Sequence, residues 1–197
     1  MKRAGRLDRQ LEFAVRLDEL KSVERMTSLI GEARRENSAE HSWHVAVLAT
    51  LLSEHAPEGV DIPRVVTMLL LHDVVEIEAG DTFCFDEEAN RDKEDRERRA
   101  ADRLFGLLPD DQATPLRATW EEFEDGRTPE ARFAVALDRF QGLLQNYHNR
   151  GGTWRLHDVA RVRVLERMAP IREGAPGLWP TVLAILDEVE EMGGPLG

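Results

Sequence analysis

The sequence predicts an all-α protein, and three observations carry this prediction. Apolar residues recur three and four positions apart in several segments, as on the buried face of a helix. Two tripeptides, Asp61-Ile62-Pro63 and Thr128-Pro129-Glu130, combine a capping side chain with an early proline, which is typical of helix starts. The sequence contains no alternating strand pattern of any length, no repeat and no low-complexity tract. Because 197 residues suit one well-filled core better than two, we expect a single domain.

The first third of the chain predicts two helices. Apolar residues between Leu11 and Val23 indicate an opening amphipathic helix from about residue 9, and a break is expected near Gly31. From Ser38 onward, His41 shares an apolar stripe with Val45 and Leu48, at intervals of four and three residues. His41 is therefore expected to face the core.

A third helix should begin at Asp61 and continue past the pair His72-Asp73 to Glu76. Residues four apart share a helical face, so His72 and Glu76 are expected to point the same way, with Asp73 rotated by about one residue's turn. Gly80-Asp81-Thr82 should break the helix and leave Asp81 near the mouth of a cavity rather than within the core.

Further helices are expected in the rest of the chain. A charged helix is predicted between Glu87 and Arg103, anchored by apolar residues up to Leu108, and another helix runs through Trp120 and Phe123. The helix after it starts at Thr128 and carries Asp138. After a break at Gly151-Gly152, amphipathic segments are predicted at Val159 to Met168 and Trp179 to Val189.

The composition narrows the choice of partner and compartment. Counting 26 Lys and Arg against 38 Asp and Glu gives a net charge of −12, which opposes binding to long nucleic acids or to anionic membranes. A small anionic ligand remains compatible with this net charge if a metal ion and local arginines make the electrostatic potential positive at one pocket. With a single cysteine, Cys84, and no apolar segment of signal-peptide or membrane-spanning length, we expect a cytoplasmic protein.

Four polar residues on otherwise apolar helices predict a metal site. His72 and Asp73 end an apolar run, while His41 and Asp138 interrupt stretches that otherwise look buried. A carboxylate is costly to remove from water unless it is paired or bound to a cation. Each residue alone has an ordinary explanation, as a hydrogen-bonded core histidine or an ion-pair partner. Together, two imidazoles and two carboxylates suit a divalent first-row cation, with coordination positions left for water and substrate. A structural zinc site would more often be closed and rich in cysteine, and this chain has only one cysteine. Open positions instead imply catalysis, and a cation that activates bound water makes hydrolysis the reaction we expect.

These residues resemble the HD domain metal-dependent phosphohydrolases. The segments Glu40-His41-Ser42, His72-Asp73-Val74-Val75-Glu76 and Gly80-Asp81-Thr82 are similar to the branch that contains the bacterial 5'-deoxynucleotidases, and the similarity extends from about Leu20 to Gly152. The resemblance implies one HD-domain helical bundle over residues 1–197, with a core at about 20–152 and helices at 153–192 packed on it. It also implies hydrolysis of nucleoside or deoxynucleoside 5'-monophosphates, and a homodimer.

The resemblance further implies roles for individual residues. His41, His72, Asp73 and Asp138 would bind one divalent ion, for which Mn, Co, Fe, Ni, Zn and Mg are all candidates. Glu76 would transfer a proton, Asp81 would position water or a substrate hydroxyl, and Arg25 would bind the phosphate.

The family pattern is not matched everywhere, so two alternative functions are kept. Met26 stands where the deoxynucleotidases carry tryptophan, and Trp43 is a candidate to fill that space. Lys93 and Arg96 either belong to a solvated face or lean over the pocket to bind substrate. Glu76 is followed by Ile77, which disfavours an alarmone hydrolase. The alternatives are a phosphodiesterase or hydrolase of larger nucleotides, and a non-enzymatic, metal-stabilised interaction module.

Overall fold

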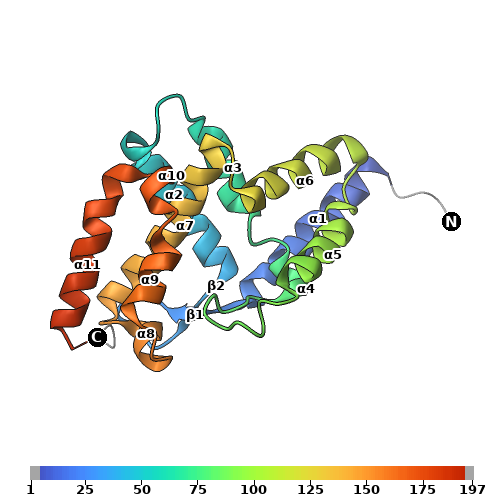
Figure 1. The fold of residues 1–197 in the computed structure, drawn as a ribbon. Coiled ribbons are helices and arrows are strands. Elements are labelled where there is room, and N and C mark those ends of the chain that lie inside the picture. The colour runs from blue at the N-terminus through green and yellow to red at the C-terminus, as the bar shows by residue number, and fades with distance from the viewer. Residues whose placement is uncertain (1–4, 194–197) are drawn as a thin grey trace.

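Helices make up most of the regular structure in the computed structural model, which describes residues 5–193 (Figure 1). The two ends of the expected 1–197 domain, residues 1–4 and 194–197, lie outside the described residues. The helices are α1 (Arg6–Leu17), α2 (Ser38–Leu51), α3 (Ile62–Leu71), α4 (Glu76–Ala79), α5 (Lys93–Phe105), α6 (Asp110–Asp125), α7 (Pro129–His148), α8 (Gly152–Leu156), α9 (Arg161–Met168), α10 (Ile171–Gly174) and α11 (Trp179–Glu191). The predicted all-α class is confirmed.

The expected helix starts have the caps that the sequence indicated. The Asp61 side chain accepts a hydrogen bond from the Arg64 amide at the start of α3, and Thr128 accepts one from the Ala131 amide at the start of α7. Asn37 caps α2 in the same way, which fixes the first turn before His41. The opening helix begins at Arg6, earlier than expected, and the charged helix α5 begins only at Lys93, because Glu87 to Asp92 form turns.

Two apolar cores meet at the middle of the molecule. One core surrounds α7 and includes Phe133 and Leu137, packed against α2, α3 and the C-terminal helices. The other lies between α1, α5 and α6 and includes Leu104 and Trp120. Figure 1 shows the C-terminal helices α8 to α11 on one side and α1, α5 and α6 on the other, with α2, α3 and α7 between them. Among residues 5–193 no helix is both long and apolar enough to cross a membrane.

The expected continuous helix from Asp61 to Glu76 is wrong. Helix α3 ends at Leu71, and residues 72–75 form turns before the short helix α4. In this segment the Val74 amide donates to Leu71 O at 3.1 Å and the Glu76 amide donates to Asp73 O at 3.0 Å, so the chain tightens to hydrogen bonds over three residues. This tighter winding turns buried His72, Asp73 and Glu76 towards one cavity.

A short hairpin that the sequence did not predict lies between α1 and α2. Strand β1 (Glu24–Ser28) pairs antiparallel with β2 (Arg35–Asn37), and the register is irregular between its two paired ends. The strands are short and mostly polar, so they lack the alternating apolar pattern by which strands are recognised. The hairpin places Arg25 and Glu36 on neighbouring strands, beside the start of α2.

Candidate functional site

Three of the four predicted ligands come together from distant parts of the chain. His41 on α2 and the His72-Asp73 pair after α3 each place a ligand atom within 4.8 Å of the others. All three side chains are buried. The fold therefore gathers two imidazoles and a carboxylate where water has little access, which is an arrangement that could hold a divalent cation.

Hydrogen bonds hold His41 from both sides of its ring. Its Nδ1 lies 3.1 Å from Gln141 Oε1 and 3.5 Å from Glu36 Oε2, while Nε2 lies 3.0 Å from Asp138 Oδ1 and 3.8 Å from Asp73 Oδ2. Burial lowers the pKa of His41, but the neighbouring carboxylates outweigh this effect and raise it to about 9. A ring held at Nδ1 by an acceptor keeps Nε2 directed at the ligand cluster.

One ring nitrogen of His72 has no hydrogen-bond partner within the described part of the chain. Its Nδ1–H donates to Leu69 O at 2.8 Å, which leaves Nε2 with a lone pair. Nε2 is fully buried and accepts no hydrogen bond from residues 5–193, and the nearest carboxylate oxygen, Asp73 Oδ1 at 3.1 Å, has no proton to give when ionised. Burial also lowers the pKa of His72, which favours the neutral ring. A buried imidazole lone pair without a donor fits a metal ion, because neutral imidazole is a metal ligand.

Asp138, the fourth predicted ligand, lies beside the cluster rather than within it. Its Oδ1 is 3.0 Å from His41 Nε2, and its Oδ2 accepts a hydrogen bond from Arg139 Nη1 at 2.9 Å. Burial raises the pKa of Asp138, yet Arg139 and His41 more than offset this and hold it well below the usual range. Asp138 is thus an anionic oxygen donor in contact with one of the three clustered residues.

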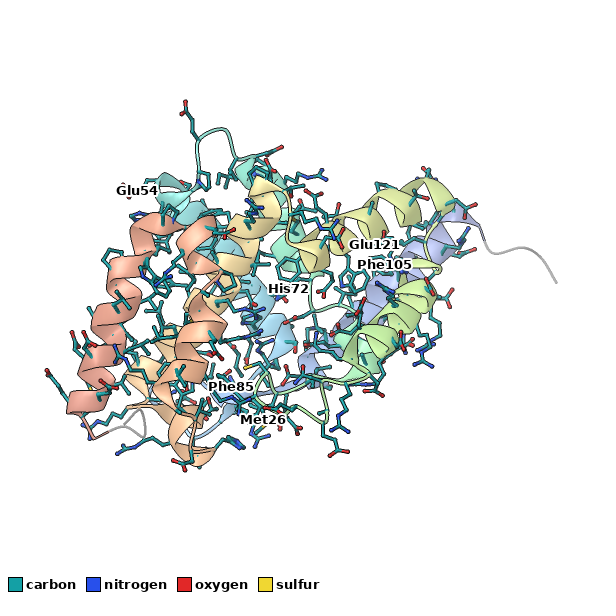
Figure 2. The ribbon with its side chains drawn as sticks, in the orientation of Figure 1. Met26, Glu54, His72, Phe85, Phe105 and Glu121 are labelled. Carbon is teal, nitrogen blue, oxygen red and sulfur yellow. The ribbon has the colours of Figure 1, made fainter. Side chains whose placement is uncertain are left out.

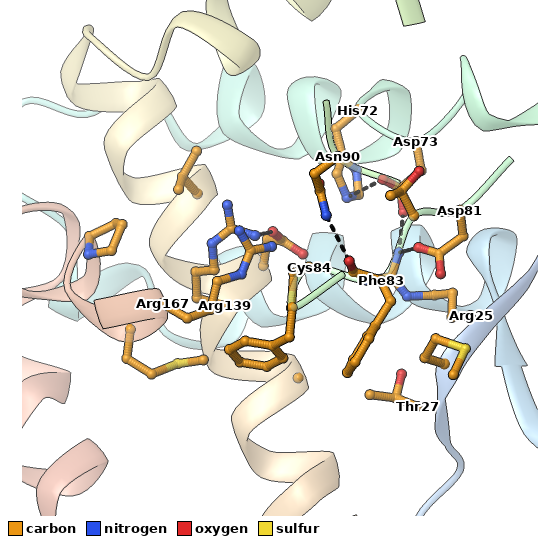
Figure 3. Close-up of a pocket in the computed structure, with 18 of the residues that line it drawn as sticks. Arg25, Thr27, His72, Asp73, Asp81, Phe83, Cys84, Asn90, Arg139 and Arg167 are labelled. Carbon is orange, nitrogen blue, oxygen red and sulfur yellow. Dashed lines mark hydrogen bonds and ion pairs between the residues drawn. The ribbon is translucent and has the colours of Figure 1, made fainter. Parts of the chain in front are cut away.

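The cluster opens into a cavity of about 780 Å³, a size typical of small-molecule sites (Figure 3). Figure 2 places labelled His72 in the middle of the molecule, between the C-terminal helices and the group of α1, α5 and α6, and His72 lines this cavity. The cavity is lined from both sides of the molecule, by Arg25 and Met26 of β1, by Asp81 and Phe83 of the loop after α4, and by residues of α7 and α9.

The two predicted catalytic carboxylates both line this cavity. Ser38 Oγ donates a hydrogen bond to Glu76 Oε2 at 2.6 Å, which holds the carboxyl group in place. Burial, reinforced by the Asp73 charge, raises the pKa of Glu76 well above its ordinary value. Burial also raises the pKa of Asp81, although Arg25 opposes the shift. Asp81 follows Gly80, whose φ of 75° ends α4 and turns the chain into the loop.

Arg25 reaches the cavity with its charge already balanced. Its Nη1 lies 2.7 Å from Asp73 Oδ2 and 3.9 Å from Asp81 Oδ1, and its Nε lies 3.7 Å from Glu36 Oε2. Three carboxylates therefore surround one guanidinium group. In this arrangement Arg25 stabilises the buried carboxylates.

Of the other three predicted substrate contacts, one lines the cavity and two do not. Lys93 lines the cavity, where its Nζ lies 2.6 Å from Glu97 Oε1. Arg96 is not among the residues that line the cavity: its guanidinium group donates to Ala79 O, Thr82 Oγ1 and Ala89 O and so braces the loop. Trp43 does not fill the space beside Met26 either: it is 65% exposed, since two residues beyond His41 a side chain lies on the opposite side of α2.

Sequence reasoning missed several residues that shape the site. Gln141 lies one turn beyond Asp138 on α7, so helical spacing alone could have suggested it. Glu36 is 2% exposed and has a buried carboxylate oxygen with no hydrogen-bond partner among the described residues, but it sits on a strand that the sequence did not reveal. Arg139 and Arg167 also line the cavity, and only the packing of α9 against α7 could show this.

Comparison with known proteins places the chain in a family. A family model described as HD domain matches residues 17–179. The 5'-deoxynucleotidase HDDC2 of Xenopus laevis is 31% identical over 136 residues, which are 68% of this chain and 66% of that protein. The human protein of the same name is 30% identical over 68% of this chain and 65% of its own length. The chain thus matches slightly less than two thirds of each of these relatives.

Solved structures agree with this placement. A crystal structure described as a predicted metal-dependent phosphohydrolase from Magnetospirillum magnetotacticum MS-1 is 51% identical, with a TM-score of 0.93 over 98% of this chain and 96% of that one. The PH0347 protein of Pyrococcus horikoshii OT3 shares the fold, with a TM-score of 0.69 at 22% identity over 89% of this chain and 97% of that one. The buried cluster of two histidines and an aspartate, and the match over residues 17–179, lead to one conclusion. This chain belongs to the HD domain family.

Proposed function

We propose that this protein is a metal-dependent phosphohydrolase that cleaves nucleoside 5'-monophosphates, including deoxynucleotides, to nucleoside and phosphate. The observation that carries this proposal is a single cavity lined by His72, Asp73, Glu76 and Asp81, with His41 clustered behind the first two. A structural metal site needs neither of these additional carboxylates. The names of the vertebrate relatives, which are 5'-deoxynucleotidases, support the choice of substrate.

His41, His72 and Asp73, with Asp138 beside them, would hold one divalent cation. When bound, such an ion supplies a Lewis acid and lowers the pKa of coordinated water. The donor set of two imidazoles and two carboxylates accepts Mn, Co, Fe, Ni, Zn or Mg. Gln141 and Glu36 keep the His41 ring oriented, and Leu69 O does the same for His72.

The carboxylates beside the cluster would move protons and orient the reactants. In the reaction the bond between phosphorus and the 5' oxygen breaks, a water oxygen bonds to phosphorus, and the 5' oxygen gains a proton. Glu76, held by Ser38, would exchange this proton. Asp81, at the start of the loop that lines the cavity, would accept a hydrogen bond from water or from a sugar hydroxyl.

A substrate screen tests the proposal. The purified protein, analysed for bound metals, is incubated with nucleoside mono-, di- and triphosphates and with diesters, and released phosphate is measured. We expect turnover of 5'-monophosphates that chelation removes and one divalent metal restores. Turnover of diesters or triphosphates alone would favour the phosphodiesterase alternative, and chelation that only lowers the melting temperature would favour the interaction module.

Domain organisation, assembly and compartment are part of the same proposal. We propose one domain over residues 1–197, supported by the packing of α9 to α11 on α7 in a shared core. We also propose a homodimer in the cytoplasm. Light scattering on the eluted protein measures the mass in solution, and a mass near 22.4 kDa would contradict the dimer.

A further inference from the structure

The cavity has a second basic wall that the catalytic proposal does not use. Arg139 of α7 and Arg167 of α9 both line it. Figure 3 shows these two side chains on one side of the cavity and Arg25 with Asp73 and Asp81 on the other, with the segment of Phe83 and Cys84 between them.

The two basic walls differ in how far their charges are already balanced. Arg25 has carboxylate oxygens at 2.7, 3.7 and 3.9 Å. Arg139 has one carboxylate partner, Asp138. The Nε atoms of Arg25 and Arg139 are both buried without a hydrogen-bond partner among residues 5–193, so the two groups differ in the number of carboxylates around them. Arg167 forms no ion pair and no hydrogen bond with the described part of the chain. Arg132 also lines the cavity without an ion pair to residues 5–193, but its side chain is exposed to solvent. The half-buried guanidinium groups of the lining with at most one carboxylate partner among the described residues are therefore those of Arg139 and Arg167.

Arg139 is also close to the ligand cluster. Its Nη1 contacts Asp138 Oδ2 at 2.9 Å, and Asp138 Oδ1 lies 3.0 Å from His41 Nε2. A single carboxylate thus separates the guanidinium group from a clustered imidazole. An anion bound by Arg139 would lie next to the cluster, where the scissile phosphate has to be.

We infer that Arg139 and Arg167 bind the phosphate group of the substrate from the α7 and α9 side of the cavity, opposite Arg25. The planar guanidinium group presents paired N–H donors that match phosphate oxygens. This inference rests on the proposed function for the nature of the substrate. It adds a phosphate contact on the wall formed by α7 and α9 to the contact expected of Arg25, which lines the same cavity.

Inorganic phosphate is the probe that tests the inference. Calorimetry measures its affinity for the purified protein, for Arg167→Gln, for Arg167→Lys and for Arg139→Lys. Arg167 forms no ion pair or hydrogen bond with residues 5–193 that its substitution would break, and lysine at 139 keeps a positive charge beside Asp138. The control is Arg172→Gln, which removes the same charge outside the cavity, where Arg172 stacks on Trp179 at 4.5 Å.

We expect Arg167→Gln to weaken phosphate binding by about tenfold to hundredfold, the range for losing a hydrogen bond to a charged group. Arg139→Lys should weaken it less, Arg167→Lys should restore part of the affinity, and Arg172→Gln should match the original protein. With a nucleoside 5'-monophosphate, Arg167→Gln should raise KM more than it lowers kcat.

The outcomes separate this inference from the proposed function. Phosphate affinity within twofold of the original protein in both Arg167→Gln and Arg139→Lys would overturn the inference, even if monophosphates are hydrolysed. Phosphate binding that depends on Arg167 in a protein that hydrolyses no monophosphate would support the anion site and overturn the proposed function.

Discussion

The outer face of α5 and the lining of the cavity are both rich in charge, yet they differ in how that charge is compensated. On α5, Arg98 lies 2.5 Å from Glu94, and these side chains are 62% and 78% exposed. Around the cavity, His41, His72 and Asp73 are at most 7% exposed. Water compensates the first group, so such pairs contribute about 0–1 kcal/mol each. The second group is compensated only by neighbouring groups, and its one imidazole nitrogen without a hydrogen-bond partner among residues 5–193, His72 Nε2, fits a bound cation.

If the cavity residues exist to hold an ion, Asp73→Ala should have the largest effect on function. Loss of this ligand should remove the bound metal and lower turnover by roughly three orders of magnitude or more, because a metal supplies several kcal/mol and each 1.36 kcal/mol is about a factor of ten. Elemental analysis and phosphate release measure the two effects. The control is Asp125→Ala, which changes an exposed aspartate at the end of α6. If Asp73→Ala retained the metal at full stoichiometry, Asp73 would not be a ligand.

Glu76→Gln should separate catalysis from metal binding. The amide cannot transfer a proton, so kcat should fall by about 10²- to 10⁴-fold while the metal content stays unchanged. Stopped or continuous phosphate assays at saturating substrate give kcat. Glu54→Gln, on the exposed turn before α3, should have no effect. A fully active Glu76→Gln protein would show that another group handles the proton.

Gln141→Ala should weaken metal binding without removing a ligand. Its Oε1 lies 3.1 Å from His41 Nδ1, and its Nε2 donates to Glu36 at 2.9 Å, so the substitution frees the ring and leaves a carboxylate unpaired. Loss of such an orienting contact typically costs about 10- to 100-fold in metal affinity. Competition with a metal indicator measures it. Gln145→Ala, one turn along the same helix and equally buried, should bind metal as tightly as the original protein.

The exposed face of α5 should give the smallest effect. Glu94→Gln breaks the pair with Arg98, and the free energy of unfolding should change by less than about 0.5 kcal/mol. For a chain of this size that corresponds to a shift in Tm below about 2 °C. Thermal unfolding at low and at high salt tests this prediction. A loss above about 2 kcal/mol would mean that solvent does not compensate charge on this face as the comparison assumes.

Local signals were enough for most of the fold. Asp61 and Thr128 cap their helices as their sequence context indicates, and His41 is buried as its place on an apolar stripe requires. Two local features were not predicted from the sequence: the β1–β2 hairpin, whose strands are polar, and the tightened turn at residues 72–75. In both cases no residue pattern marks the change, because the hydrogen bonds that define it depend on neighbouring elements.

The partners of individual side chains needed the folded chain. The sequence singled out His41, His72, Asp73 and Asp138, but Trp43 turned out to face solvent and Arg96 to brace the loop. Arg25 and Glu36 could be linked only through the hairpin, and Arg167 could be linked to Arg139 only through the packing of α9 on α7.

Helical periodicity by itself predicted an all-α chain with His41 on a buried stripe, and the resemblance of the histidine and aspartate motifs to the HD family supplied the expected ligand set. The first prediction depends on nearest neighbours along a helix, which the sequence records directly. Tertiary structure alone decided which carboxylates surround Arg25 and which guanidinium groups remain open to an anion. The carboxylates around Arg25 lie 11, 48 and 56 positions from it in the printed sequence, and Arg139 and Arg167 lie 28 positions apart. The energies of these contacts depend on burial and distance, which only the packed chain defines.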